Sequence, residues 1–326
     1  MNKQIISIDS GKHSTKVVSH KDNYNLVKSI FRTRAMPNDG NLEPMGNTHS
    51  VEFQNKKYLI GDQGESFSTE LSKATEIHSI SAYCGITQVL NDEIGQAVKL
   101  VYGCPVNIYK NKDYRDECKN KLLQNKEIYI VVDGKEYLFE IENVALMPEG
   151  SGVVYLFPSL FAGQRVAVID IGGLNMNFTI YNKMVPEIDS MLTDNLGSYY
   201  LLNQIKKEIS SKYNRVISQN DAESILSNGY IKIKGSIEEQ SVKIVNDILD
   251  EYMNSIKKFI INNNHDIDTI DVVISGGTAL IISDALKKHI PHARILENTQ
   301  WHNALGFLKV GEYQYEKQSK WLQDHN

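Results

Sequence analysis

Val-Ala-Val-Ile-Asp-Ile-Gly-Gly-Leu-Asn-Met-Asn, residues 166–177, joins four apolar residues to an acidic side chain and two glycines. A short apolar run bounded by turn residues is typical of a buried strand, which here ends at Asp170. Gly172 and Gly173 leave the backbone bare enough for a phosphate to approach closely. We therefore interpret the stretch as half of a nucleotide-binding clamp.

The same pattern occurs near the N-terminus, in Ile-Ile-Ser-Ile-Asp-Ser-Gly-Lys-His-Ser-Thr-Lys at residues 5–16. There the apolar run ends at Asp9, and Gly11 follows two residues later. Two copies about 160 residues apart indicate two similar halves that face each other across a ligand. A chain of 326 residues also exceeds the usual size of a single hydrophobic core, so two lobes are expected.

Each glycine turn is followed by strand-like residues and not by a helix. After the first copy, residues 15–20 and 24–29 flank a polar turn; after the second, residues 177–181 and 184–188 do so. A dinucleotide-binding fold or a P-loop would place the phosphate at the start of a helix directly after the glycines. The pattern instead predicts a phosphate held in a hairpin turn by successive backbone N–H groups.

The remaining sequence predicts alternating helices and strands. The expected helices cover residues 87–97, 112–123, 198–213, 219–226, 237–261, 279–288 and 301–313. The expected strands cover residues 98–102, 127–132, 135–141, 143–147, 230–234 and 269–275, and residues 33–82 form a polar excursion. Asp133-Gly134 is typical of a type I′ hairpin. The three-to-four spacing of apolar residues over 237–261 is typical of a helix packed on a core.

Composition excludes several classes of protein. The net charge of −5 leaves no excess of Lys and Arg to displace phosphate counterions, so we expect no direct DNA binding. Cys84, Cys104 and Cys118 are odd in number and lack metal-type spacing, which predicts reduced thiols in a cytoplasmic protein. The apolar run at residues 5–8 is too short for a signal peptide, and no run approaches the roughly 18 apolar residues of a membrane span.

Four glycine-bearing strand ends, at Asp9, Glu149, Asp170 and Ser275, are what a nucleotide site between two lobes requires. One Asp-x-Gly by itself is a common turn. Four glycine-bearing strand ends in this order are much less likely to arise by accident. The motifs resemble those of the actin and sugar-kinase ATPase superfamily, and within it the bacterial actin-like plasmid-segregation proteins of the ParM group. The matching segments are residues 9–16, 101–106, Pro148-Glu149-Gly150, 170–173, 275–279 and Asn303-Ala304-Leu305-Gly306.

The resemblance implies an α/β fold, the actin-like two-lobed ATPase fold, in which two duplicated ribonuclease-H-like domains flank a nucleotide cleft. The first domain is expected over residues 1–162, with a small subdomain at 33–82 and a C-terminal helix at 304–326 that completes it. The second domain is expected over residues 163–303, with a helical subdomain at 198–265.

The resemblance also implies roles for single residues. Asp9 and Asp170 would act in catalysis by holding Mg²⁺ largely through water, and Glu149 would orient or deprotonate the attacking water. The residues implied in nucleotide binding are the backbones of Ser10, Gly11, Lys12, Gly172 and Gly173, the ammonium of Lys16 on the β- and γ-phosphates, Gly276, Gly277 and Thr278 at the adenosine, and Glu223 at the ribose. Simpler interpretations are a solvated strand lysine for Lys16, a helix N-cap neighbour for Glu149 and an exposed helix acid for Glu223.

The sequence departs from the family pattern in both phosphate loops. Lys12 and His13 stand where many actins have Ser and Gly, so phosphate sensing in the first loop is expected to differ. In the second loop, Asn175 and Asn177 follow Gly172-Gly173, where the family commonly has Thr and Asp. The second half of this loop is therefore where we expect this protein to differ most.

The implied function is that of a cytoskeletal ATPase with ATP, or alternatively GTP, and Mg²⁺ as its cofactors. ATP binding would favour head-to-tail self-association into filaments, and a DNA-binding adaptor protein of the ParR type would link filaments to plasmid DNA. The alternatives are a cell-division or cell-shape homologue similar to FtsA or MreB, and a non-polymerising kinase of the same superfamily. The tail at residues 311–326 lacks the basic, apolar character of a membrane-binding helix, so no membrane partner is expected.

Overall fold

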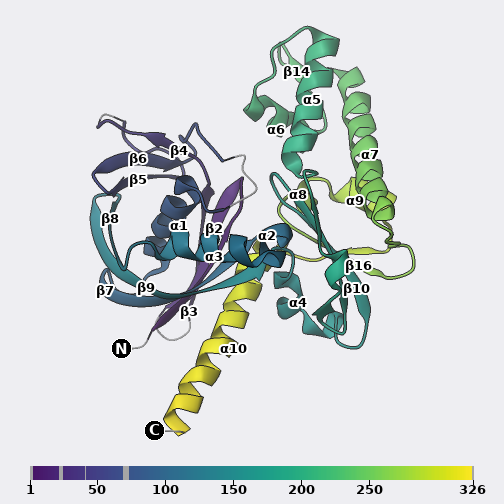
Figure 1. Cartoon of the computed structure of the whole chain (residues 1–326). Coiled ribbons are helices and arrows are strands. Elements are labelled where there is room, and N and C mark those ends of the chain that lie inside the picture. Colours follow the sequence, from purple (N-terminus) through teal and green to yellow (C-terminus); the bar gives the residue numbers. More distant parts are fainter. Residues whose placement is uncertain (1–2, 22–24, 41, 69–72, 325–326) are drawn as a thin grey trace. The chain divides into compact units, whose positions relative to one another are not determined.

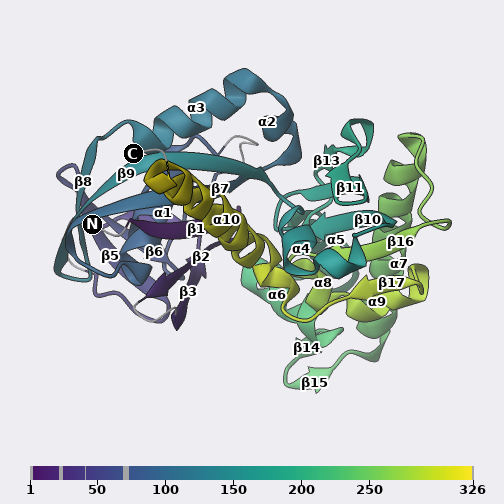
Figure 2. The same cartoon turned by 90° about the horizontal axis from the view of Figure 1, so that it is seen from below.

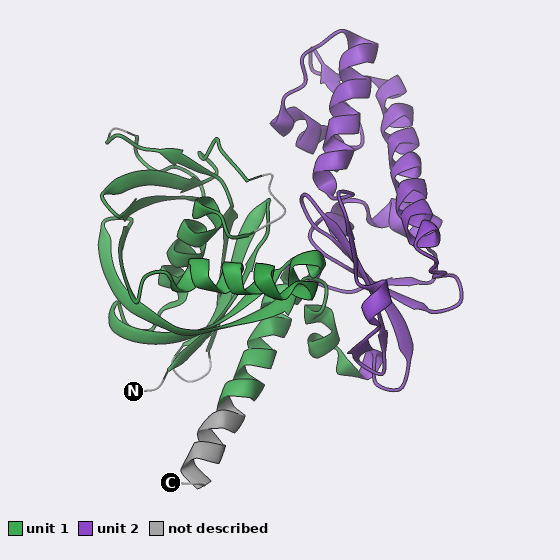
Figure 3. Ribbon diagram, in the orientation of Figure 1, with its two compact units in different colours: residues 1–158, 301–326 green, residues 159–300 purple. Residues whose placement is uncertain are grey.

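Two compact units make up the chain in the computed structural model, which describes residues 3–21, 25–40, 42–68 and 73–324, with side chains up to residue 315. Unit 1 comprises Met1–Pro158 and Trp301–Asn326, and unit 2 comprises Ser159–Gln300 (Figure 3). Each unit has a hydrophobic core of its own. Within the described residues, no helix combines the length and the apolar character needed to cross a membrane.

One nine-stranded sheet runs through unit 1 (Figure 1). Its strands are β1 Gln4–Ser10, β2 Ser14–Lys21, β3 Asn25–Arg32, β4 Ala35–Pro37, β5 Thr48–Phe53, β6 Lys56–Gly61, β7 Ile94–Cys104, β8 Glu127–Val132 and β9 Lys135–Pro148. Their order is β3-β2-β1-β7-β9-β8-β5-β6-β4. The first three strands pair in antiparallel fashion, whereas β7 runs parallel to β1 and β9 runs parallel to β7.

Helices cover both faces of this sheet. They are α1 Glu76–Val89, α2 Val106–Lys110, α3 Lys112–Leu123, α4 Gly152–Leu156 and α10 His302–Asp324, with a 3₁₀ turn at Pro158–Leu160. Successive side chains of a strand point to opposite faces. Val17 of β2 therefore packs into the core that contains α1, whereas Val18 packs against Ala304 and Leu308 of α10. Helix α10 lies along β1 and β2 (Figure 2). The elements β1 and β2 are thus buried on both sides.

Unit 2 is built on a smaller sheet with helices against one face. Its strands are β10 Arg165–Ile171, β11 Met176–Asn182, β12 Val185–Pro186, β13 Leu192–Asp194, β16 Asp271–Ser275 and β17 Ala293–Ile295, and a separate ribbon pairs β14 Lys232–Ile233 with β15 Ser236–Ile237. Its helices are α5 Ser198–Tyr213, α6 Gln219–Asn228, α7 Glu239–Asn262, α8 Thr278–Ile281 and α9 Ser283–His289, with 3₁₀ turns at Ile188–Ser190 and Thr299–Trp301. Ala167, Ile169 and Ile171 of β10 form the core with these helices.

The same arrangement of strands occurs in both units. The order β3-β2-β1-β7-β9 of unit 1 corresponds to β12-β11-β10-β16-β17 of unit 2, with antiparallel pairs in the first half and parallel pairs in the second. Even the register agrees, because Asp9 lies opposite Lys16 and Asp170 lies opposite Asn177. The prediction of two similar halves is confirmed.

Several predicted elements are confirmed, and one is wrong. The helices at residues 112–123 and 198–213 and the hairpin about Asp133-Gly134 occur as predicted. The helix predicted at residues 87–97 does not: α1 ends at Val89, and residues 94–97 belong to β7. Because α1 is buried on almost all sides, its sequence lacks the polar stripe of a surface helix. Residues 94–97 are strand because they pair with β9.

Other elements differ in their bounds. The strands predicted at residues 135–141 and 143–147 form the single strand β9, and a register shift between Val98 and Lys99 of β7 accommodates the extra residue. The helix predicted at residues 279–288 is divided into α8 and α9, and the strand predicted at 184–188 is reduced to β12. The last helix continues beyond residue 313 to Asp324.

The helices α4 and α10 cross at two glycines. A Cβ atom on Gly306 would lie 2.0 Å from the carbonyl oxygen of Gly152, and a Cβ atom on Gly152 would lie 2.2 Å from the carbonyl oxygen of His302. Both obstacles are backbone atoms, which cannot turn aside as the end of a flexible side chain can. The crossing therefore requires glycine at both positions.

We expect Gly306→Ala to lower the free energy of unfolding by about 1–3 kcal/mol through overpacking. This loss outweighs the gain of about 1 kcal/mol in helix propensity that alanine brings relative to glycine. Urea unfolding followed by circular dichroism measures the difference. Gln314→Ala, at an exposed position of the same helix, is the control and should change stability little. A Gly306→Ala protein as stable as the wild type would contradict the close crossing.

Candidate functional site

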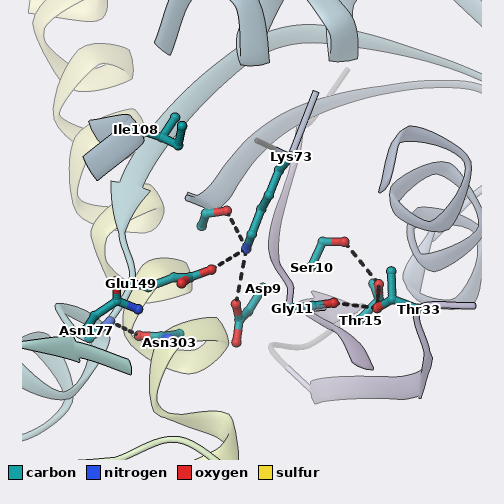
Figure 4. A network of polar contacts seen from close by, with 12 residues as sticks. Asp9, Ser10, Gly11, Thr15, Thr33, Lys73, Ile108, Glu149, Asn177 and Asn303 are labelled. Carbon is teal, nitrogen blue, oxygen red and sulfur yellow. Dashed lines mark hydrogen bonds and ion pairs between the residues drawn. The ribbon is translucent and has the colours of Figure 1, made fainter. Parts of the chain in front are cut away.

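The first glycine turn, residues 9–16 or loop 1, is held by a chain of hydroxyl groups (Figure 4). The Gly11 N–H donates to the carbonyl oxygen of Ser14 at 3.0 Å, which closes the turn. Thr33 Oγ1 donates to the carbonyl oxygen of Gly11 at 2.7 Å and lies 2.9 Å from Thr15 Oγ1. Thr15 Oγ1 in turn lies 3.1 Å from Ser10 Oγ. The residue that follows β3 thus fixes the conformation of loop 1.

Four charged side chains meet at loop 1, and three of them, Asp9, Lys73 and Glu149, are labelled in Figure 4. Lys16 Nζ lies 3.4 Å from Asp9 Oδ2, and Lys73 Nζ lies 3.8 Å from Asp9 Oδ1. Lys73 Nζ also lies 2.5 Å from Glu149 Oε1. The structure therefore brings together Asp9, Lys16 and Glu149, which the sequence singles out, and adds Lys73, which sequence analysis missed.

Lys73 is buried between the ends of three strands. Besides the two carboxylates, its ammonium contacts the carbonyl oxygen of Gly103 at 3.0 Å. Burial alone lowers the pKa of Lys73, but the charges of Glu149 and Asp9 outweigh that effect, so its pKa lies above the ordinary value. No local pattern marks this residue, because it follows a polar stretch and its partners are distant in the sequence.

Glu149 is placed by backbone contacts just beyond the end of β9. Its N–H donates to the carbonyl oxygen of Cys104 at 2.9 Å. The next N–H, of Gly150, donates to Asn303 Oδ1, also at 2.9 Å. Two of the segments that match the family pattern, residues 148–150 and 303–306, therefore contact each other within unit 1. This contact holds Glu149 beside Lys73.

The cluster around loop 1 suits an anion. The residues Lys12, Lys16 and Lys73 are 6%, 9% and 2% exposed, respectively, and carry three positive charges against the two carboxylates of Asp9 and Glu149. Nearby, burial and then the charges of Lys12 and Lys73 hold the pKa of His78 well below its usual range, so this imidazole is neutral. Buried positive charge beside a glycine turn is what a phosphate-binding site needs.

The second glycine turn, residues 170–177 or loop 2, repeats the geometry of loop 1 within unit 2. The Gly172 N–H donates to the carbonyl oxygen of Asn175 at 2.9 Å, as Gly11 does to Ser14. The carbonyl oxygens of Gly172 and Gly173 accept the N–H groups of Ser198 and Tyr199 at 3.0 and 2.8 Å. The start of α5 thus supports loop 2.

These turn hydrogen bonds change one expectation. The sequence predicts that the N–H groups of Gly11 and Gly172 donate to phosphate, but in the structure both donate to carbonyl oxygens of their own turns. The physical reason is that an N–H three residues before a carbonyl closes a tight turn. The two glycines still leave the backbone of each loop open to close approach.

The glycine segment after β16 contacts loop 2 directly. Thr278 Oγ1 donates to the carbonyl oxygen of Gly172 at 2.9 Å. Gly276 has a φ of +90°, and a Cβ atom on it would lie 2.3 Å from the carbonyl oxygen of Ile171 and 2.7 Å from Asp170 Oδ1. Asp170, Gly172, Gly173, Gly276, Gly277 and Thr278 are thus gathered at one edge of unit 2. Glu223 lies half-buried on α6, on a different element.

The two asparagines of loop 2 have different surroundings. Asn177 Oδ1 accepts a hydrogen bond from Thr193 Oγ1 at 2.8 Å, so it has a structural role. Asn175 is 6% exposed, and no donor among the described residues reaches its Oδ1. An amide can turn over and present its NH₂ group instead. Asn175 is therefore a further candidate to contact an anion at loop 2.

The residues present fit Mg²⁺ only as a largely hydrated ion. Among the described residues, no three His, Cys, Asp or Glu side chains gather into a metal-binding group. Both oxygens of Asp9 also face ammonium groups, at 3.4 and 3.8 Å. Mg²⁺ commonly keeps several waters and takes few protein ligands besides phosphates, which suits a lone carboxylate of this kind.

Known proteins resemble the chain over nearly its full length. Residues 7–152 match the family described as "Actin like proteins N terminal domain". The structure "Alp12 filament structure" is 31% identical with a TM-score of 0.69, covering 97% of this chain and 100% of that chain. No curated protein sequence gives a significant match.

Two further structures show the same fold at lower identity. The archaeal actin homolog Ta0583 in complex with ADP is 17% identical with a TM-score of 0.75, covering 95% of this chain and 99% of that chain. A ParM protein in a 15-stranded filament from Clostridium botulinum is 19% identical with a TM-score of 0.77, covering 96% of this chain and 100% of that chain.

The adjacent glycines after β16 offer a matched pair of variants. We expect Gly276→Ala to destabilise unit 2 by at least about 1 kcal/mol, because alanine is strained at positive φ. Gly277→Ala should fold normally, since its φ is −69° and the nearest atom to a new Cβ is Gln300 Cβ at 3.6 Å. If adenosine approaches this backbone, the added methyl group should still weaken MgATP binding about tenfold or more. Calorimetric titration measures the affinity; an unchanged value for Gly277→Ala would contradict the adenosine assignment.

Proposed function

This chain belongs to the actin-like protein family, and on that premise we propose that it is a nucleotide-dependent, filament-forming ATPase that segregates plasmid DNA. The observation that carries the proposal is the buried positive cluster at loop 1, where three lysines and two carboxylates surround a glycine turn. The same turn occurs in unit 2, and in this proposal it also contacts phosphate. Both turns are followed by a strand, as in the family pattern.

In this proposal loops 1 and 2 bind the phosphates of ATP. Lys16 contacts the β- and γ-phosphates, with N–H groups of both loops and the buried Lys12 in support. Gly276, Gly277 and Thr278 allow the adenosine to lie close to the backbone, and Glu223 contacts the ribose. The complex of the archaeal homolog with ADP supports an adenine nucleotide, with GTP as the alternative.

Hydrolysis would depend on three carboxylates. Asp9 and Asp170 would hold hydrated Mg²⁺, which when bound would offset negative charge on the phosphates. Glu149 accepts a hydrogen bond from the attacking water and orients it toward the γ-phosphate. The ion pair with Lys73 fixes the position of this carboxylate, as an orienting group requires.

Assembly follows from contacts between copies of the chain. The filaments of the Alp12 protein and of the Clostridium botulinum ParM support self-association here. A contact between two different surfaces that does not close into a ring produces an open helix, as filament growth requires. With a net charge of −5, the chain would reach plasmid DNA through a DNA-binding adaptor protein of the ParR type, in the cytoplasm.

We expect MgATP to cause a rise in right-angle light scattering of the purified protein, followed by decay as phosphate is released. ATP binding favours the assembled form, and hydrolysis weakens it. The same sample with MgADP is the control and should scatter less. Absence of a rise up to high protein concentration, together with ATP use that depends on an added acceptor molecule, would contradict the filament and favour a kinase.

We expect Glu149→Ala to reduce phosphate release by about 100-fold or more, because the attacking water loses its orienting group. ATP should still bind, since Glu149 contacts water and not the phosphates. Phosphate release and calorimetric titration measure the two effects separately. Glu127→Gln, at an exposed position of the neighbouring strand β8, should leave both unchanged. Wild-type turnover in Glu149→Ala would remove this residue from the mechanism.

A further inference from the structure

We propose that Lys73 binds the terminal phosphate of the nucleotide and thereby distinguishes ATP from ADP, an inference that rests on the proposed function. Its ammonium lies 2.5 Å from Glu149 Oε1, the carboxylate that orients the attacking water. In phosphoryl transfer the attacking water is in line with the phosphorus of the γ-phosphate. A cation in contact with the water-orienting carboxylate is therefore placed at that end of the triphosphate.

The two lysines beside Asp9 are placed differently along the triphosphate: Lys16 contacts the β- and γ-phosphates, whereas Lys73 contacts the γ-phosphate alone. Lys16 lies on β2 as the last residue of loop 1 and approaches Asp9 Oδ2 at 3.4 Å. Lys73 approaches the other oxygen, Oδ1, and alone of these two lysines has a close contact with Glu149 among the described ion pairs. Lys16 therefore belongs with the phosphates held by loop 1. Lys73 belongs with the phosphate that ADP lacks.

The hydrogen bonds of Lys73 leave capacity for a phosphate oxygen. A lysine ammonium has three N–H donors. Two are used at close range, by Glu149 Oε1 at 2.5 Å and by the carbonyl oxygen of Gly103 at 3.0 Å. The third faces Asp9 Oδ1 at 3.8 Å, which is too long for a hydrogen bond. This donor can turn to a γ-phosphate oxygen while Lys73 continues to hold Glu149.

The segment that carries Lys73 is anchored, so the ammonium is held at this position. Thr75 Oγ1 lies 2.7 Å from His78 Nδ1 in the first turn of α1, and the Ser79 N–H donates to the Thr75 carbonyl oxygen at 3.1 Å. The ring of Tyr102 lies beneath the ammonium, with its centroid 5.7 Å from Nζ. A cation held in place before its ligand arrives binds more tightly, because less conformational freedom is lost.

A purely structural role explains the buried ion pair less well. Replacing a buried ion pair by apolar residues is often neutral or stabilising, so such a pair is weak evidence for stability. Buried groups whose pKa is displaced by specific charged partners are found preferentially at functional sites. Lys73, with carboxylates on two sides and almost no exposed surface, is such a group.

The test compares the affinities of Lys73→Met for MgATP and MgADP by calorimetric titration. We expect the ATP affinity to fall about 10- to 100-fold, the value of one hydrogen bond to a charged group, and the ADP affinity to change less than about threefold. Lys56→Met is the matched control, because Lys56 forms an exposed ion pair with Glu76 at 3.2 Å in the same part of unit 1. Both of its affinities should equal those of the wild type.

Two further variants keep the test decisive if Lys73→Met folds poorly. Lys73→Met combined with Glu149→Gln leaves less uncompensated buried charge, and against Glu149→Gln alone it should lose ATP affinity selectively. Lys73→Arg retains the positive charge and should therefore retain part of the preference for MgATP over MgADP. The inference would be overturned if the affinities for ATP and ADP fell equally. It would also be overturned if the ratio of the two affinities stayed the same while the unfolding temperature fell. Wild-type protein that binds neither nucleotide would overturn the proposed function itself.

Discussion

The ion pair between Lys73 and Glu149, with Asp9 beside it, is the interaction on which the site in unit 1 depends. Removing charges from water costs more than a single contact returns, so each of these side chains requires the others. Through them, the end of β1, the residue beyond β9 and the segment before α1 meet at one point. The chemistry of the site and the packing of unit 1 therefore share the same residues.

Close backbone contacts set the second constraint. Gly152 and Gly306 bring α4 against α10, and the same contact region includes the hydrogen bond from the Gly150 N–H to Asn303 Oδ1. In unit 2, Gly276 brings the end of β16 against the carboxylate of Asp170. At each of these points a side chain would meet backbone or a buried carboxylate. Glycine thus occurs where two elements of the fold must approach each other closely, as well as where a ligand is proposed to approach the backbone.

Duplication gives the two units one arrangement of strands but different chemistry. Lys16 and Asn177 occupy equivalent register positions opposite the two aspartates. In unit 1 this position carries a charge and belongs to a cluster of buried lysines, whereas in unit 2 it carries an amide that supports β13 through Thr193. Loop 1 therefore carries the lysine cluster of the proposed site, whereas loop 2 carries the carboxylate of Asp170 together with backbone and amide groups.

The sequence by itself determined the two Asp-x-Gly hairpins and most long helices, because these are encoded by local patterns of apolar, acidic and glycine residues. The grouping of Asp9, Lys16 and Glu149 followed from the family resemblance of the motifs. Only the tertiary structure decided the rest. Helix α1 has no polar stripe because it is buried on almost all sides. The Gly11 and Gly172 N–H groups close their own turns, and Thr33 holds loop 1 from the end of β3. Lys73 joins Asp9 and Glu149 across 64 and 76 residues of sequence, a distance over which no local pattern carries information.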